Sequence, residues 1–334
     1  MDVAQLGEQE LIRRMAEVLS SVANPAVSTD VLVGIGDDAA LVQWDSPSAL
    51  LKSDQQVEGV HFDRSWAEPE DVGWKALAVN LSDIASMGGT PHSALISLAV
   101  PTETEVSWVE RLCSGLAQAA SAYGVEVVGG DTSSSSVIVI NVALTGTLSV
   151  RGGSRPDPLL RSNGMVGDVV AVTGSFGGAG ACLRLLTGAG DKRPTAGLMK
   201  ALLRPVPRVL EGRVLREEGV RAAIDVSDGL LSDLGRLCGA SGLSGVVDAA
   251  AVPVHEDVYA CFPLGETLEI ALTAGEDYEL LFTAPAEVVE RVASRVETPV
   301  SVIGRLVPDP AGEVIVEGRA GAPVEFPSSG WRHF

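Results

Sequence analysis

The clearest pattern of hydrophobic and polar positions lies between residues 72 and 87. Apolar residues recur there at intervals of three and four, which predicts a helix with a long apolar face. Gly88, Gly89 and then Pro91 end this helix. Asp83 lies within it, and no basic residue stands three or four positions away. Because an acid on a nearly apolar helix needs a partner from elsewhere, we predict a functional role for Asp83.

Strands and helices mix along the rest of the chain. Strands are predicted at 50–54, 94–100, 125–128, 137–148, 168–173, 222–226, 268–272, 278–283 and 300–306, and helices at 5–20, 102–124, 227–240 and 285–296. This order is typical of an α/β (α+β) protein. The 334 residues exceed one ordinary core, and a segment rich in Gly, Pro, Arg and Ser spans 149–166. We therefore expect two domains, 1–150 and 151–334.

Net charge and leader signals narrow the choice of partners. The formal net charge of −20 argues against nucleic acid or an anionic membrane as a partner. A soluble acidic surface accounts for most of the excess negative charge, and carboxylates gathered at a metal site account for the rest. The first 19 residues carry early acids and no signal-peptide core, and no apolar run approaches a membrane span. We expect a cytoplasmic protein.

The positions of seven aspartates are the most informative polar feature. They fall at strand ends, after glycine turns and on the helix at 72–87: Asp37, Asp38, Asp54, Asp83, Asp131, Asp225 and Asp228. Two carboxylates about 4 Å apart repel by roughly 4 kcal/mol at an effective dielectric of about 20. Mg²⁺ relieves such repulsion because it binds carboxylates together with substrate phosphates. The pattern predicts a magnesium site that serves phosphoryl transfer.

Several of these residues also allow plainer interpretations. Asp37 or Asp38 alone fits a turn, and Asp228 alone fits a helix N-cap. Lys75 and Arg161 are by default solvated surface charges. The sequence alone does not decide between these structural interpretations and a functional role.

Two glycine-rich segments are candidate phosphate sites. The segment 174–180 lies between a strand and a helix, where its backbone N–H groups either face a phosphate or allow tight packing. The segment 34–39 fits a loose dinucleotide fingerprint, which we reject because a strand and turn follow instead of a helix. The sequence contains no P-loop and no protein-kinase catalytic loop.

Six ordered motifs and the chain's ending resemble one family. They are GIGDDAA (34–40), SDQQVEGVHF (53–62), KALAVNLSDIASMGGTP (75–91), VVGGDTS (127–133), AAIDVSDGLLSDL (222–234), AGEDYELLFT (274–283) and GWRHF (330–334). Their order and spacing resemble thiamine-monophosphate kinase, a family of the aminoimidazole-ribonucleotide synthetase-like superfamily. The resemblance covers nearly the whole chain, 6–334.

The resemblance implies a fold and a reaction. It implies an N-terminal α/β domain that forms a homodimer through its sheet, and a C-terminal α/β domain that closes over a nucleotide cleft. The implied reaction transfers a phosphoryl group from ATP to thiamine monophosphate, giving ADP and thiamine diphosphate. Direct in-line transfer fits a chain with many carboxylates and no obvious nucleophile or general base.

The resemblance also implies site residues, position by position. The implied metal ligands, for several Mg²⁺ ions, are Asp38, Ser53, Asp54, Asp83, Asp131, Asp225 and Asp228. The implied ATP contacts are Tyr123, Gly130, Asp131, Arg161 and Ser227. The implied substrate contacts are His61, Glu276 and Trp331. Without the resemblance, His61 fits a structural role as well as a substrate contact, and Glu276 fits a turn. Lys52 departs from the family because a small hydroxyl residue is expected there; its cation either replaces the charge of one metal or faces away.

Other functions remain as alternatives. One alternative is an enzyme of the same superfamily that acts on another acceptor, and aminoimidazole-ribonucleotide synthetase is the example that remains possible. Selenophosphate synthetase is disfavoured because the N-terminal glycine-rich segment has no reactive cysteine, and hydrogenase-maturation enzymes because the chain ends in Phe334. A non-catalytic nucleotide-binding protein is expected to lose some of the seven aspartates, and all are present.

Overall fold

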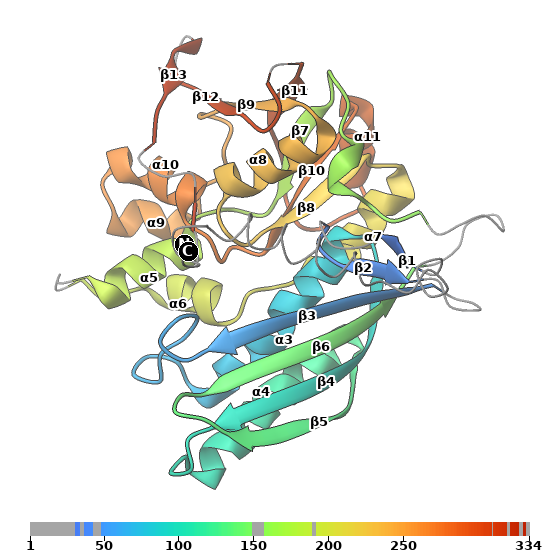
Figure 1. The fold of residues 1–334 in the computed structure, drawn as a ribbon. Coiled ribbons are helices and arrows are strands. Elements are labelled where there is room, and N and C mark those ends of the chain that lie inside the picture. Colours follow the sequence, from blue (N-terminus) through green and yellow to red (C-terminus); the bar gives the residue numbers. More distant parts are fainter. Residues whose placement is uncertain are drawn as a thin grey trace, which may run out of the picture.

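The structure is a computed structural model, and it describes residues 31–33, 37–42, 48–148, 157–188, 192–308, 310–318, 321–326 and 330–331. The helix predicted at 5–20 and the glycine turn at 34–36 lie outside the described residues. Two β-sheets, each packed against helices, lie one beyond the other (Figure 1). No helix in the described ranges is long and apolar enough to cross a membrane.

The first sheet has six strands in the order β1-β2-β3-β6-β4-β5. Their bounds are β1 Val31–Val33, β2 Ala40–Val42, β3 Ala49–Val57, β4 Thr90–Val100, β5 Glu126–Ser134 and β6 Val139–Thr147. Neighbouring strands are antiparallel except β4 and β5, which are parallel. Alternate residues of β6, including Ile140, Val142 and Leu144, are buried. This period of two matches a sheet with one covered face.

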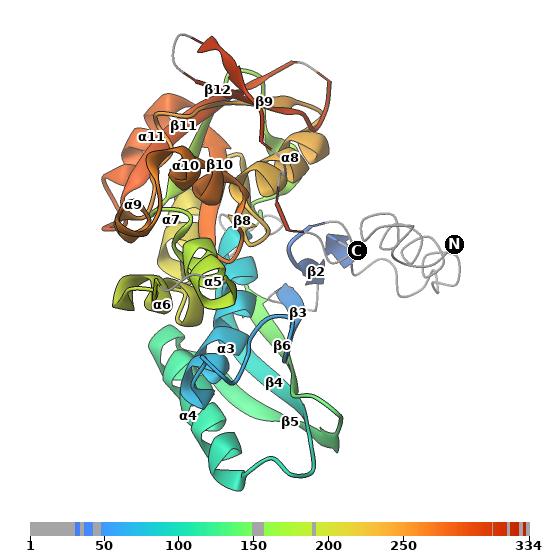
Figure 2. The ribbon, with the colours of Figure 1, turned by 90° about the vertical axis from the view of Figure 1, so that its left-hand side faces the viewer.

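Helices α3 (Pro69–Ser86) and α4 (Val106–Tyr123) cover that face (Figures 1 and 2). In α3, almost every residue from Val72 onward is buried, because the helix lies between the first sheet, α4 and elements of the second half of the chain. A helix surrounded in this way needs apolar residues on nearly all sides. Polar residues in its middle must therefore find partners inside the protein.

The two helices approach each other backbone to backbone at two glycines. A Cβ atom at Gly115 would lie 1.9 Å from the backbone oxygen of Glu70, and one at Gly73 would lie 2.1 Å from that of Leu112. We expect Gly115→Ala to lower the free energy of unfolding by about 1–3 kcal/mol, because the helices must separate. Gly265→Ala is the matched control, since nothing lies within 4 Å of that position. Urea denaturation measures both; equal stabilities would contradict the close packing.

The second sheet has seven strands in the order β13-β12-β9-β11-β7-β10-β8. Their bounds are β7 Val169–Thr173, β8 Ala222–Val226, β9 Ser244–Asp248, β10 Glu279–Ala284, β11 Val300–Val307, β12 Val314–Glu317 and β13 Pro323–Val324. Pairings are antiparallel except that of β12 with β9. The short helix η2 is Arg161–Asn163, and the longer ones are α5 Gly178–Thr187, α6 Ala196–Leu203, α7 Val209–Glu218, α8 Leu230–Ser241, α9 Glu256–Cys261, α10 Leu264–Thr273 and α11 Ala286–Ala293.

Two apolar clusters cover the two faces of this sheet. One joins α8 and α10 to the strands through residues such as Leu234, Leu272 and Leu281. The other joins α7 and α11 through residues such as Leu215, Val292 and Phe282. The edge strand β8 contacts α3 of the first half. The polar ends of β8 and the polar residues of α3 are thereby brought together.

Several predicted elements are corrected by the structure. The predicted strand at 268–272 is wrong, because these residues lie in α10 and bury the consecutive residues Ile270, Ala271 and Leu272. The helix predicted from 102 begins at Val106, with Glu105 as N-cap and no side-chain cap. Asp131 does not follow a turn but lies inside β5, which continues to Ser134.

Candidate functional site

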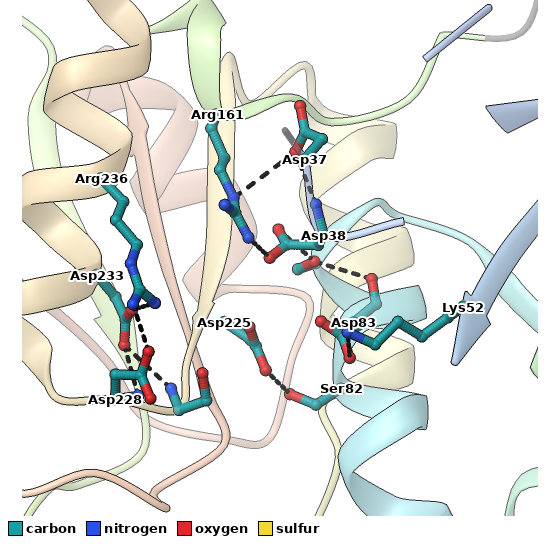
Figure 3. A network of polar contacts seen from close by, with 12 residues as sticks. Asp37, Asp38, Lys52, Ser82, Asp83, Arg161, Asp225, Asp228, Asp233 and Arg236 are labelled. Atoms are coloured by element: carbon teal, nitrogen blue, oxygen red, sulfur yellow. Dashed lines mark hydrogen bonds and ion pairs between the residues drawn. The ribbon is translucent and has the colours of Figure 1, made fainter. Parts of the chain in front are cut away.

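Three buried carboxylates meet where the two halves of the chain join. Asp38 precedes β2, Asp83 lies on α3 and Asp225 lies on β8. Each offers an oxygen atom, and these atoms lie within 4.8 Å of one another. Figure 3 shows the three side chains pointing toward a common point. The convergence predicted for these three aspartates is found in the structure.

The partner of Asp83 is Lys52. Its Nζ lies 3.0 Å from Asp83 Oδ2 and 3.9 Å from Asp54 Oδ2. Lys52 lies on β3, so strand pairing supplies the cation that α3 itself lacks. Burial acts to lower the pKa of Lys52, but Asp83 and Asp54 raise it above its ordinary value. Lys52 therefore faces the carboxylates and not the solvent.

Arg161 holds the Asp38 end of the cluster. Its Nη2 donates to Asp38 Oδ1, and its Nε lies 3.8 Å from Asp37 Oδ1. The default interpretation of Arg161 and Lys75 as solvated surface charges is wrong. Lys75 is 2% exposed, forms an ion pair with Glu276 and donates to the backbone oxygen of His61.

Asp225 links the two halves directly. Its Oδ2 accepts a hydrogen bond of 2.7 Å from Ser82 Oγ on α3. Burial and then the charge of Asp38 raise the pKa of Asp225 to about 7. Burial raises the pKa of Asp83 well above its usual range, and Lys52 opposes that rise. The cluster thus carries charge that the protein compensates only in part.

Asp228 is not the N-cap of α8. The helix begins at Leu230, its N-cap is Gly229 and no side chain caps it. Asp233, in the first turn of α8, accepts the backbone N–H groups of residues 227–229 at 3.0–3.2 Å. Arg236 joins Asp228 and Asp233 through ion pairs of 2.5 and 2.8 Å (Figure 3). Burial raises the pKa of Asp233 to about 8. The sequence pattern alone does not single out Asp233 or Arg236.

A cavity of about 1090 Å³ surrounds the cluster. It is lined by the implied residues Asp38, Ser53, Asp54, His61, Asp83, Arg161, Asp225, Ser227, Asp228, Glu276 and Trp331. Its volume lies near the top of the roughly 300–1,000 Å³ range that is usual for sites that bind small molecules.

Two residues of the cavity lining have a strained backbone conformation. Glu276 has φ 73° and Tyr278 has φ 50°, both in the left-handed region that non-glycine residues avoid. The Tyr278 hydroxyl donates to Glu276 Oε1 at 3.2 Å, and Lys75 pairs with the other oxygen. His61 Nδ1 accepts the backbone N–H of Val57 at 3.0 Å. The implied substrate residues Glu276 and His61 are thus held in fixed positions.

Three implied residues lie elsewhere. Tyr123, at the end of α4, packs edge-on against Trp74 with ring centroids 6.2 Å apart. Gly130 and Asp131 are exposed on the edge strand β5. Within one chain, β6 and β4 separate β5 from β3, a distance of about 14 Å at the usual strand spacing. None of the three lines the cavity.

The glycine-rich segment 174–180 has an internal partner. Both carboxylate oxygens of Asp277 accept the Gly177 N–H, at 3.0 and 3.1 Å. Burial raises the pKa of Asp277 well above its usual range. A protein carboxylate therefore holds the start of α5, where the sequence allowed a phosphate.

The chemistry of the donors suits a hard divalent cation. The three carboxylates offer oxygen ligands, the kind that Mg²⁺ takes, and the cavity beside them leaves room for phosphate oxygens. The residues present fit Mg²⁺.

Comparison with known proteins identifies the family. Family models for the N-terminal and C-terminal domains of AIR synthase related proteins match residues 36–148 and 165–317. Thiamine-monophosphate kinases from Salmonella typhimurium and Aquifex aeolicus are each 36% identical, covering 91% and 100% of this chain and 93% and 100% of theirs. The chain belongs to the thiamine-monophosphate kinase family. The resemblance seen in its motifs is confirmed.

Similar solved structures support this family assignment. A structure described as AaThiL complexed with AMPPCP and TMP has a TM-score of 0.85 and 36% identity, covering 100% of this chain and 99% of that one. The hydrogenase maturation protein HypE, at 20% identity and a TM-score of 0.68, shares the fold alone. The predicted two-domain α/β architecture of the family is confirmed.

Proposed function

We propose that the protein phosphorylates thiamine monophosphate to thiamine diphosphate with ATP, assisted by Mg²⁺. The observation that carries this proposal is the convergence of Asp38, Asp83 and Asp225 beside a cavity of about 1090 Å³. The family supports it, as does the related structure with AMPPCP and TMP. The reaction is that of an ATP-dependent kinase whose acceptor is itself a phosphate.

Direct in-line transfer fits the side chains at the site. A phosphate monoester is largely ionised at neutral pH, so its oxygen attacks without a strong general base. Lys52 and Arg161 place positive charge beside the carboxylates. The Glu276 side chain, which contacts Tyr278 and Lys75, positions the acceptor. Bound Mg²⁺ would neutralise charge on the transferring phosphoryl group.

The remaining roles follow the family by position and are proposed as a set. We assign metal binding to Asp38, Ser53, Asp54, Asp83, Asp131, Asp225 and Asp228, ATP binding to Tyr123, Gly130, Asp131, Arg161 and Ser227, and thiamine monophosphate binding to His61, Glu276 and Trp331. Domains of 1–150 and 151–334 and a cytoplasmic location stay predictions.

A homodimer through the uncovered face of the first sheet would account for Gly130 and Asp131, which lie outside the cavity of their own chain. All nine residues of β5 are exposed, and the exposed apolar residues Leu95, Val127 and Val128 lie on β4 and β5. Among the described elements, α3 and α4 cover only one face of this sheet (Figure 2). A second copy packed on the uncovered face would bury these residues and bring its Gly130 and Asp131 toward the first copy's cavity.

This arrangement predicts complementation between inactive variants. Asp83→Asn and Asp131→Asn are each expected to be inactive, and mixing them under subunit exchange should restore about a quarter of the activity, because one site in a mixed dimer is intact. Coupled ATP-turnover assays of the mixture measure this, with sedimentation equilibrium to establish the dimer. A fully active Asp131→Asn variant, or a monomeric protein, would contradict the shared site.

Acceptor-dependent ATP consumption tests the function itself. We expect ADP to form with thiamine monophosphate in the presence of Mg²⁺, and thiamine diphosphate to appear in equal amount by chromatography. The substrate of aminoimidazole-ribonucleotide synthetase is the comparison acceptor. ADP formation with that compound and not with thiamine monophosphate would favour the superfamily alternative; no ATP use at all would favour a non-catalytic nucleotide-binding protein.

A further inference from the structure

We infer that the Lys52 ammonium group is a built-in cation of the site, which takes the place of one divalent ion beside Asp83 and Asp54. The inference deepens the proposed function and rests on it in one respect only, that the cluster binds divalent cations. It concerns how many metals this chain holds.

The geometry of Lys52 carries the inference. Its Nζ lies within contact distance of two carboxylates from different elements, Asp83 on α3 and Asp54 on β3. The Lys52 side chain is only 21% exposed, and Figure 3 shows it extending from β3 toward Asp83. An oxygen of each carboxylate is thereby directed to an ammonium group.

The chain itself supplies positive charge to the carboxylate cluster. Asp38, Asp83 and Asp225 carry three negative charges when ionised, and Lys52 and Arg161 bring two positive charges from opposite sides of the cluster. Part of the neutralisation that divalent ions would supply is therefore supplied by the chain. A divalent ion next to Asp83 and Asp54 would also be repelled by the Lys52 ammonium a few ångströms away.

The experiment counts Mn²⁺, used in place of Mg²⁺, bound to protein without either substrate. Electron paramagnetic resonance of free Mn²⁺ gives the number of ions bound per chain and their affinity. The variants are Lys52→Ser, which supplies a hydroxyl and space, and Lys52→Met, which keeps the length without the charge. Lys52→Arg keeps the charge, and Lys200→Ser, at an exposed position on α6, is the matched control.

We expect Lys52→Ser and Lys52→Met to bind one more Mn²⁺ per chain than the wild type, or to bind Mn²⁺ about ten-fold or more tightly. Lys52→Arg and Lys200→Ser should match the wild type. If the charge-removing variants are too unstable to titrate, the midpoint of thermal unfolding, measured against Mg²⁺ concentration, should rise more steeply for them. Unchanged ion number and affinity in both variants, or no steeper rise in that midpoint, would overturn the inference. The measurement involves no turnover, so a protein inactive on thiamine monophosphate can still satisfy it, and an active one can still fail it.

Discussion

Replacing Asp83 with asparagine is expected to lower turnover of thiamine monophosphate by about a hundredfold or more. The amide keeps the shape of the side chain but removes one of three converging charges that hold a cation against the phosphates. It also leaves Lys52 with Asp54 alone, at 3.9 Å. Asp54→Asn is expected to act in the same direction. Steady-state kinetics at saturating Mg²⁺ measure the loss.

The control for this prediction is Asp157→Asn, which removes an aspartate charge at an exposed position that does not line the cavity. It should leave turnover unchanged. Circular dichroism should show that all three variants keep the fold. Near wild-type turnover in Asp83→Asn would rule out a shared metal site at this cluster.

The second large effect is a gain in stability from Asp225→Asn in metal-free protein. The pKa of Asp225 is raised from 3.8 to about 7, chiefly by burial. The folded state therefore holds this proton more tightly than the unfolded state, so stability falls as pH rises from about 4 to 7 and stays low above that. Asparagine removes this penalty and still accepts the hydrogen bond from Ser82. At pH 8 we expect the variant to be more stable by about 2–4 kcal/mol, although its kinase activity is lost.

Urea denaturation in the presence of a chelator checks this at two pH values. The stability difference between Asp225→Asn and the wild type should be present at pH 8 and vanish near pH 4. Saturating Mg²⁺ should also reduce it, because the cation stabilises only the wild-type carboxylate. A difference that is the same at both pH values would show that Asp225 is not a buried, partly compensated charge.

The sequence predicted the features that depend on local pattern. The helix around Asp83 was visible because apolar residues recur along it, and Asp225 was visible because it lies in a short apolar run followed by glycine. The partner of Asp83 was not visible from the helix alone, because Lys52 reaches it only after β3 and α3 pack together. Proximity of this kind is set by tertiary structure.

The errors have similar physical causes. Residues 268–272 alternate in a way that fits a strand, but packing on the second sheet buries them as a helix. The role of Asp233 cannot be read from the sequence, because a capping carboxylate is expected before a helix. Asp233 lies inside the first turn of α8 and accepts the backbone N–H groups of residues 227–229 from there. Asp131 is displaced from the cavity because β5 continues through its glycines as an exposed edge strand.

Anomalous scattering from Mn²⁺ in crystals grown with AMPPCP and thiamine monophosphate would locate the cations at the three converging carboxylates. We expect Mn²⁺ peaks about 2.0–2.3 Å from carboxylate oxygens of Asp38, Asp83 and Asp225, on the same ions that contact the nucleotide phosphates. Peaks confined to other acidic residues, with both substrates bound away from these three carboxylates, would contradict it.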